Sequence, residues 1–330
     1  DLRALDEPGL KAHVISTLFP AAEGPDGLGA AVDRICTEAS AAIADGATIL
    51  ILSDRGVDRD RVPIPSLLAT GAVHQHLVRE QTRTECGIVV ESGEPREVMH
   101  FALLTGFGAG AVNPYLAFET VYDLLTKDVL HLGSIEEAVS NYIHAVEKGL
   151  LKVMSKIGIS TQHSYRNAQI FEAVGLSSAF VDRFFTGTVS RVEGIGLDEV
   201  ARETLMRYAV AYPPQPARKP SLDPGGQYRW RKQGEFHQFG PETIATIQRA
   251  VRTNDWGRYQ EFAATVNDRN RTLATLRGLL QFKKGTPIPI DEVESVDSIV
   301  KRFCTGAMSF GSISKEAHET LAIAMNRLGG

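Results

Sequence analysis

The sequence predicts an α/β protein in which parallel βα units are followed by a mainly helical region and then by one more βα unit. Three features predict this order. Residues 47–53 form a near-continuous apolar run, which is typical of a parallel strand with helices on both faces. Strand-like and helix-like apolar patterns alternate four times in the first third of the chain. A long amphipathic segment, residues 135–153, follows in the middle third.

The first third contains four strand-helix pairs in succession. We expect strands at His13–Phe19, Ala47–Ser53, Cys86–Glu91 and Gly108–Asn113, and helices at Leu28–Ala44, Ser66–Val78, Val98–Leu104 and from Pro114 onward. This alternation favours a parallel sheet with right-handed crossovers. Four units make either half of an eight-stranded barrel or an open doubly wound sheet, and periodicity leaves both open.

Polar residues follow the predicted strands, where the carboxyl ends of parallel strands meet at one edge of a sheet. They are Ser53, Asp54, Arg55, Glu91, Ser92, Asn113 and Tyr115. The loops lack the glycine-rich pattern that brings backbone N–H groups to a phosphate, so we expect a structural half-barrel that binds no cofactor of its own. Asp54 and Arg55 could clamp a substrate, but a brace between strand ends explains them at least as well, and we favour the brace.

Helices dominate the predicted middle third. Ile135–Val153 should be one helix capped by Ser134, with Glu137 available for a capping box, and Gly158–Gly175 should turn and enter another helix. The proline-rich stretch Ala211–Pro220 predicts an exposed, extended connector. We expect further helices at Pro241–Arg252 and Trp256–Phe282, and an extended link at Lys283–Asp291.

The last thirty residues predict the first strand and helix of a barrel. Gly306–Ser309 is a short run of small and apolar residues, Ser314 can cap a helix, and apolar residues recur at helical spacing up to Leu328. One strand and one helix cannot close a barrel. We therefore expect an internal piece of a larger protein.

Composition narrows the class of protein. At 330 residues, 43% hydrophobic and 23% charged, the chain can bury a core, and its length suggests about two domains. The net charge of -5 and the scattered basic residues argue against nucleic acid, and no apolar run suits a membrane span. Cys36, Cys86 and Cys304 are isolated, so we expect reduced thiols, no metal or iron-sulfur site, and a cytoplasmic location.

Several segments resemble one enzyme family. Residues 47–56, 63–77 and 110–119 resemble the end of the central domain of the glutamate synthase large subunit. Residues 301–330 look very like the opening of the same family's FMN-binding domain, which is a TIM-type barrel. The resemblance covers nearly the whole chain. It implies that residues 1–128 end the central domain, 129–300 connect, and 301–330 start the FMN barrel.

The resemblance also implies a function for the parent protein. Glutamate synthases make L-glutamate from L-glutamine and 2-oxoglutarate by amidotransfer, internal ammonia channelling and FMN-dependent reduction. The glutaminase domain, the rest of the FMN barrel and the ligands of a 3Fe-4S cluster would all lie outside this chain. The partners would then be the rest of the polypeptide and either a small electron-transfer subunit or ferredoxin. We expect this piece alone to be inactive.

By the same resemblance, Gly306, Ala307, Met308 and Ser309 would form a strand beside the FMN ring, where small residues permit close approach. Weaker candidates for a channel or flavin-side role are Ser164, Tyr165 and Gln169. No residue here is predicted to be catalytic or to bind a metal.

Two rival interpretations remain open. The chain could be a non-enzymatic interaction module, which a large exposed apolar face would indicate. It could also be a free-standing barrel hydrolase, which requires Asp54, Glu91 and His74 to converge on one pocket. His74 and His76 do not share a helix face, so a metal pair is not expected, and structural roles are the better prediction for His100, His144 and His163.

Overall fold

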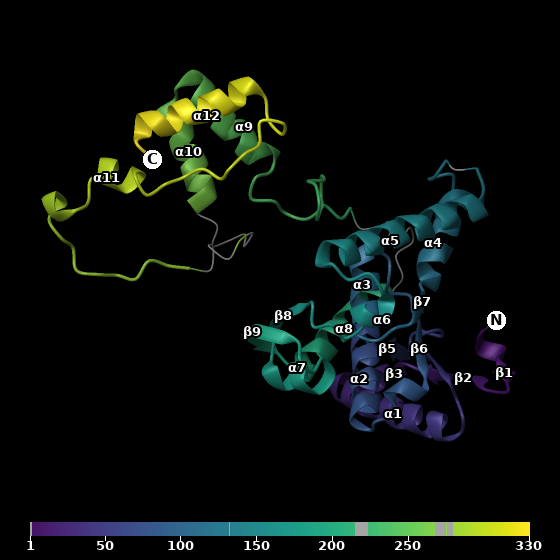
Figure 1. Cartoon of the computed structure of the whole chain (residues 1–330). Coiled ribbons are helices and arrows are strands. Elements are labelled where there is room, and N and C mark those ends of the chain that lie inside the picture. The colour runs from purple at the N-terminus through teal and green to yellow at the C-terminus, as the bar shows by residue number, and fades with distance from the viewer. Residues whose placement is uncertain (1, 132, 215–223, 268–274, 276–279) are drawn as a thin grey trace. The chain divides into compact units, whose positions relative to one another are not determined.

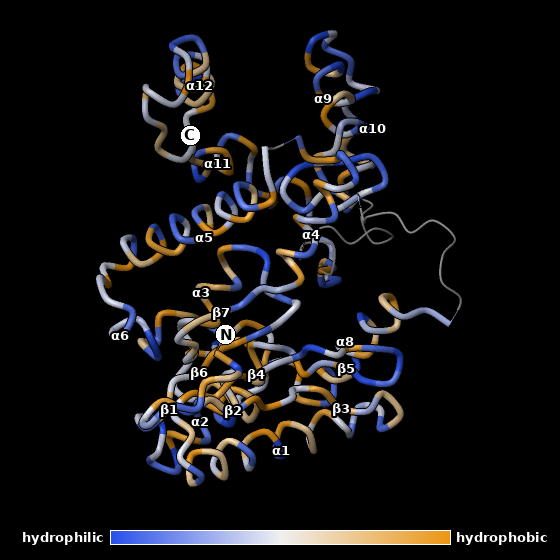
Figure 2. Tube along the Cα trace, turned by 90° about the vertical axis from the view of Figure 1, so that its right-hand side faces the viewer, coloured by the Kyte–Doolittle hydropathy of each residue, from blue (hydrophilic) through white to orange (hydrophobic). Residues whose placement is uncertain are grey.

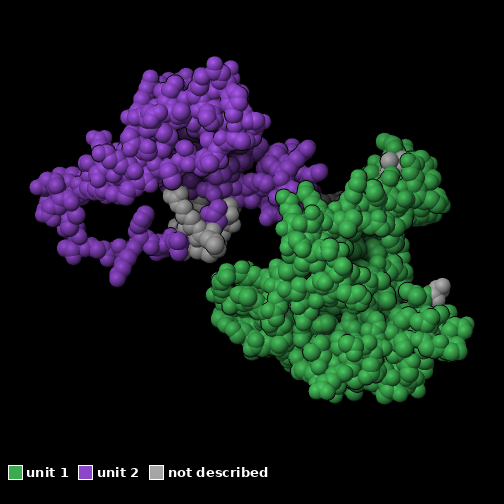
Figure 3. All heavy atoms as spheres, viewed as in Figure 1, with its two compact units in different colours: residues 1–220 green, residues 221–330 purple. Residues whose placement is uncertain are grey.

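The computed structural model describes residues 2–131, 133–214, 224–267, 275 and 280–330. The chain divides into two compact units, residues 1–220 and residues 221–330 (Figure 3). No helix in the described ranges is both long and apolar enough to cross a bilayer.

A parallel sheet forms the centre of unit 1. Its strands are β2 (Leu10–Ser16), β4 (Ile49–Ser53), β6 (Gly87–Glu91) and β7 (Ala111–Asn113), and they are neighbours in the order in which they occur in the chain. A short strand, β1 (Asp6–Glu7), pairs antiparallel with β2 at one edge. The four predicted strands are confirmed. Their order has no reversal, which favours the half-barrel over the doubly wound sheet.

Helices connect these strands as the periodicity predicts. They are α1 (Gly24–Ala44), α2 (Ser66–Arg79) and α3 (Val98–Gly106), and α4 (Tyr115–Thr126) follows β7. The first three pack in sequence, α1 against α2 and α2 against α3. Figures 1 and 2 show these helices beside the strands, with apolar residues concentrated where they meet. This arrangement explains why three successive residues of β4 are all buried.

The core of unit 1 lies between the sheet and its helices. Leu50 and Ile88 of the sheet, Ile35 of α1, and Val73 and Leu77 of α2 are completely buried. Strands β3 (Leu18–Pro20) and β5 (Arg61–Pro63) form a separate antiparallel pair. Unit 1 also contains short 3-10 helices at Leu2–Ala4, Ala21–Glu23 and Arg83–Glu85, and unit 2 contains one at Ile290–Glu292.

The long predicted helix is confirmed as α5 (Ile135–Ile157). The Ser134 hydroxyl accepts a hydrogen bond from the Glu137 N–H, as the capping pattern predicts. The helix ends at Gly158, whose φ of 80° is a left-handed conformation that glycine adopts without strain.

The prediction of a helix through Gly158–Gly175 is wrong beyond its first turn. Helix α6 covers only Gln162–Tyr165. Asn167 and Gln169 then have φ values of 54° and 55°, which are incompatible with a continuing right-handed helix.

A small parallel sheet follows, which the sequence did not reveal. It consists of β8 (Glu172–Leu176) and β9 (Val189–Ile195), linked by α7 (Ser178–Phe184), and α8 (Leu197–Ala211) follows. Helix α7 packs on α2, and α8 packs on α1. The middle third is therefore mixed rather than mainly helical.

Unit 2 contains four α-helices within the described residues. They are α9 (Pro241–Thr253), α10 (Trp256–Asn267), α11 (Val296–Val300) and α12 (Lys315–Leu328). The Ser314 hydroxyl accepts from the Ala317 N–H, and Gly329 ends α12 with a φ of 71°, so the predicted terminal helix is confirmed. Residues 280–282 are not helical, and 268–274 and 276–279 of the predicted helix lie outside the described residues.

Other predictions have mixed outcomes. The predicted link at residues 283–291 has no regular structure before a 3-10 helix at Ile290. The proline-rich connector lies largely outside the described residues, and the domain limits at residues 128 and 300 stay predictions. Residues 306–309 are not a strand in this structure, because a strand requires a hydrogen-bonded partner and none of the described strands pairs with them, so the barrel strand stays a prediction.

Close packing of α2 on α7 yields a stability prediction. A Cβ at Gly71 would lie 2.6 Å from Phe185 Cε1 and 2.7 Å from the Phe184 carbonyl oxygen. We expect Gly71→Ala to lower the free energy of unfolding by about 1–3 kcal/mol, because backbone cannot yield as a side chain can. Urea unfolding followed by circular dichroism measures this change.

Gly29, in α1, is the matched control. A Cβ there meets only Leu197 Cδ2 at 3.5 Å, an ordinary contact. Gly29→Ala should leave stability unchanged or raise it by up to about 1 kcal/mol. Equal stability of the two variants would contradict the close approach of α7 to α2.

Candidate functional site

The polar residues predicted at the carboxyl ends of the strands do lie together. Ser53 of β4 is in register with Glu91 of β6, and Glu91 is in register with Asn113 of β7. Both Ser53 and Glu91 are buried, as are Asp54 and Ser92, the residues that follow them. The sheet therefore places two buried carboxylates at one edge.

Glu91 is the centre of the first half of this cluster. Its carboxylate accepts hydrogen bonds from Ser53 Oγ at 2.6 Å and Arg55 Nε at 2.8 Å, and it also accepts one from Arg3. Burial alone would raise the pKa of Glu91, but these donors outweigh it and lower the pKa to about 2. Glu91 is therefore a permanently charged carboxylate at physiological pH.

Asp54 is the centre of the second half. It accepts from Ser92 Oγ at 2.5 Å, from Tyr115 Oη at 2.7 Å and from the Gly93 N–H at 3.1 Å. Burial raises the pKa of Asp54, while these same hydrogen bonds oppose the rise. Arg55 joins the halves, because its guanidinium lies over the Tyr115 ring, 4.1 Å from the centroid.

This geometry favours a brace over catalysis. A general base needs an acceptor free to take a proton, whereas donors from three strand ends occupy both carboxylates. The prediction that Asp54 and Arg55 brace the strand ends is confirmed by these contacts. Arg3 was not predicted to belong to this cluster, because it lies 88 positions from Glu91 along the chain and no local pattern marks it.

The hydrolase interpretation is wrong. His74 Nδ1 accepts from Arg83 Nε at 2.9 Å, and Arg83 also donates to the Cys86 carbonyl, just before β6 begins. His74 thus lies near the amino ends of the strands, whereas Asp54 and Glu91 lie at the carboxyl ends. The three side chains do not converge on one pocket.

Other predicted structural roles fit the contacts. His100 Nδ1 accepts from the N–H groups of Arg96 and Glu97 at the start of α3. His76 Nε2 lies 2.8 Å from Ser40 Oγ. Among the residues that the structure describes, no group of three or more His, Cys, Asp or Glu side chains is placed to hold a metal ion.

The four residues predicted to contact FMN lie in an open segment. All four are exposed, and a Cβ at Gly306 would meet no heavy atom within 4 Å apart from its chain neighbours. The nearest order is a local turn, where Ser312 Oγ donates to the Ser309 carbonyl at 2.8 Å. Residues 306–309, including Ala307 and Met308, do not by themselves form a flavin cradle.

The three weaker candidates differ in burial and in their contacts. Tyr165 is completely buried, and its hydroxyl donates to the Ala102 carbonyl at 3.1 Å. Ser164 is exposed and bonds to Thr161 at the start of α6. Gln169 is exposed, and its side chain lies against Gly187. A channel or flavin-side role for these residues stays a prediction.

The fold and site define an α/β protein whose parallel strands end in a braced polar cluster. A family model described as the glutamate synthase central domain matches residues 1–177, and one described as a conserved region in glutamate synthase matches residues 237–330. The chain therefore belongs to the glutamate synthase family, as the sequence analysis predicted.

Relatives named for three different electron donors match almost all of the chain. The NADPH glutamate synthase large chain of Bacillus subtilis is 48% identical over 330 residues, which cover 100% of this chain and 21% of that protein. The NADH glutamate synthase of Schizosaccharomyces pombe is 44% identical, covering 98% of this chain and 15% of its own length. The ferredoxin-dependent glutamate synthase of Pyropia yezoensis is 42% identical, covering 100% and 22%. This chain thus spans between 15% and 22% of the length of these relatives.

The brace predicts a specific pH dependence. Because the pKa of Glu91 is lower in the folded state than its ordinary value of 4.5, its contribution to stability is complete above pH 4.5 and is lost as the pH falls toward about 2. Glu91→Gln should lower the free energy of unfolding by about 1–3 kcal/mol at neutral pH and remove this part of the acid dependence. Urea unfolding across this pH range measures both effects.

Glu119 is the matched control, because it is exposed and lies 3.7 Å from the same guanidinium, Arg55. Glu119→Gln should change stability by less than about 0.5 kcal/mol, as for most exposed ion pairs. Parallel pH profiles for the wild-type chain and Glu91→Gln would contradict a charged, clamped Glu91.

Proposed function

We propose that this chain is a scaffold segment of a glutamate synthase large subunit. The parent enzyme would make L-glutamate from L-glutamine and 2-oxoglutarate by amidotransfer, internal ammonia channelling and FMN-dependent reduction. The observation that carries this proposal is the match to glutamate synthases from one end of the chain to the other.

The braced strand ends support a scaffold role for unit 1. In many barrels the carboxyl ends of the strands carry an open active site. Here Asp54 and Glu91 are buried and saturated with donors, so this edge can hold its loops in place but offers no free base. Unit 1 would position neighbouring domains and wall a channel for ammonia, with Ser164, Tyr165 and Gln169 as candidates for its lining.

The end of unit 2 would contribute to a flavin site only in the larger protein. Gly306–Ser309 would form the first strand of the FMN barrel once neighbouring strands pair with it, and α12 would be the helix that follows. The order of a small-residue segment, a capped start at Ser314 and an amphipathic helix supports this role. FMN would supply the redox chemistry, and this chain would supply one wall of its site.

The partners would be the glutaminase domain and the remaining barrel of the same polypeptide. The relatives are named for NADPH, NADH and ferredoxin, so the electron donor of the parent protein would be one of these three. Electrons would arrive through a small subunit or ferredoxin, with a 3Fe-4S cluster held outside this chain and the whole protein in the cytoplasm.

Exposed apolar side chains support a second candidate function, that of a non-enzymatic interaction module. Val251, Trp256 and Leu328 of unit 2 are 70%, 68% and 56% exposed. Surfaces of this kind serve as contact sites for other protein. A pure interaction module would need no flavin in any longer form of the protein, which separates it from the synthase proposal.

Titration of FMN tests the proposed role of the terminal segment. The 330-residue chain and a version extended through the rest of the barrel would be titrated in parallel, with flavin absorbance and fluorescence as signals. We expect binding only by the extended protein. Failure of both proteins to bind would overturn the flavin assignment and leave a scaffold or interaction module.

Two glycine variants test whether Gly306 itself lies at the flavin site. In the extended protein, Gly306→Leu should weaken FMN binding at least about tenfold, because a side chain would separate the strand from the ring. Gly285→Leu is the control, since Gly285 also has open space around its Cβ position but lies in the preceding link. Equal affinity of the two variants would remove Gly306 from the flavin site.

A further inference from the structure

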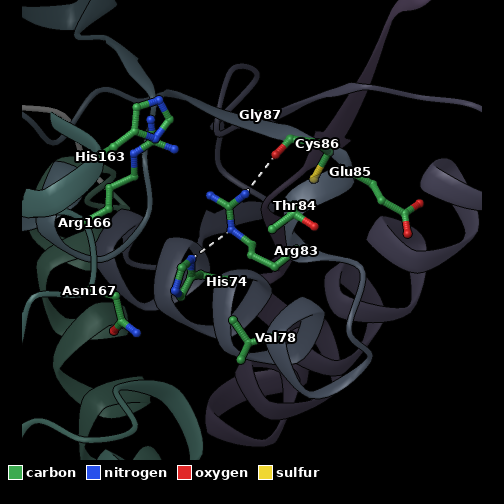
Figure 4. Close-up of a pocket in the computed structure, with 10 residues that line it drawn as sticks. All are labelled: His74, Val78, Arg83, Thr84, Glu85, Cys86, Gly87, His163, Arg166 and Asn167. Atoms are coloured by element: carbon green, nitrogen blue, oxygen red, sulfur yellow. Dashed lines mark hydrogen bonds between the residues drawn. The ribbon is translucent and has the colours of Figure 1, made fainter.

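A pocket lies at the opposite end of the sheet from the brace. Its volume is about 600 Å³, within the range of small-molecule sites. Figure 4 shows His74 and Arg83 on one side of it and His163, Arg166 and Asn167 on the other. Both sides belong to unit 1, so the pocket is formed within one compact body.

Three hydrogen bonds hold Arg83 in place, and one of them fixes the tautomer of His74. It donates from Nε to His74 Nδ1 at 2.9 Å, from Nη1 to the Cys86 carbonyl at 2.8 Å and from Nη2 to the Gly108 carbonyl at 2.9 Å. Since Nδ1 is an acceptor, the proton of the neutral ring is on Nε2. Burial, with the charges of Arg83 and Arg166, lowers the pKa of His74 to about 4, so the ring is neutral at physiological pH.

Gly108 makes this arrangement possible. Its φ of 126° is a conformation that L side chains rarely adopt, and a Cβ there would lie 2.6 Å from His74 Nδ1. Only glycine lets the backbone carbonyl reach Arg83 while the imidazole packs alongside. The cluster is therefore built into the fold rather than being a chance contact on the surface.

Two donors in this cluster have no acceptor within the described part of the chain. His74 is only 6% exposed, and its Nε2 has no hydrogen-bond partner among the described residues. Arg166 Nε is likewise buried without a partner in that part of the chain. An unsatisfied buried donor costs about 1–3 kcal/mol, so a cluster with two of them is incomplete without an acceptor.

The charge of the pocket indicates which acceptor is missing. Arg83 and Arg166 both line it, and their like charges lower the pKa of His74. The one carboxylate on the described lining, Glu85, is directed away from Arg166 and His74 in Figure 4. An oxyanion would therefore satisfy the donors and compensate the two guanidinium charges together.

We propose that this pocket binds the oxyanion of a small molecule, a carboxylate or a phosphate, between the Arg166 guanidinium and the His74 Nε2–H group. Both nitrogens are shielded from solvent here and have no partner among the described residues, so the bound anion would accept a hydrogen bond from each of them. The bound anion links α2 to the segment after α6. This binding site is separate from the scaffold role, which requires no ligand at this end of the sheet.

Calorimetric titration of the 330-residue chain with inorganic phosphate and with succinate, at constant ionic strength, tests the site. We expect saturable binding of at least one anion, and the tighter of the two identifies the ligand as a phosphate or a carboxylate. Arg166→Gln should weaken binding about tenfold or more, and Arg166→Lys should weaken it less because the charge remains. Arg191→Gln, which removes an exposed arginine paired with Glu172 on the small sheet, should leave binding unchanged.

Nuclear magnetic resonance of the histidine ring supplies an independent readout. A bound anion stabilises the imidazolium, so saturation should raise the pKa of His74 from about 4 in the wild-type chain but not in Arg166→Gln. Absence of saturable binding, or equal binding by wild type and Arg166→Gln, would overturn the proposal. Folding of each variant is checked by circular dichroism, and Arg166 is only partly buried, so its replacement should not unfold unit 1.

Discussion

A buried carboxylate clamped by two arginines is the constraint on which the rest of unit 1 depends. Glu91 ends strand β6, which lies between β4 and β7, and it cannot remain charged inside the protein without compensation. Arg3 comes from the chain before the sheet, and Arg55 comes from the loop after β4. The clamp therefore fixes the strand register and both flanking segments together, and Asp54 extends it to Tyr115 at the start of α4.

The two ends of the sheet solve the problem of buried polar groups differently. At the carboxyl end every buried carboxylate has several donors, so the cluster is complete as it stands. At the amino end each nitrogen of the Arg83 guanidinium donates to one acceptor, while His74 Nε2 and Arg166 Nε have none among the described residues. A cluster whose hydrogen bonds are all satisfied suits a structural brace, whereas a cluster with unsatisfied donors suits a ligand-binding site.

Local sequence patterns predicted the features that depend on short-range physics. The four strands, their helices and the caps at Ser134 and Ser314 follow from apolar periodicity and side chain to backbone bonds within a few residues. The strand-end cluster was predictable because parallel strands bring their carboxyl ends to one edge. The small sheet of β8 and β9 was not, because its pairing depends on partners distant in sequence, and nothing local marks Arg3 as the partner of Glu91.

Membership of the glutamate synthase family also constrains what this segment can do. Relatives named for NADPH, NADH and ferredoxin match between 98% and 100% of the chain at 42–48% identity. A segment shared so evenly by proteins with different electron donors is a poor place for the feature that distinguishes those donors. A role common to all three, holding domains in register around a shared reaction, fits both this similarity and the saturated state of Glu91 and Asp54.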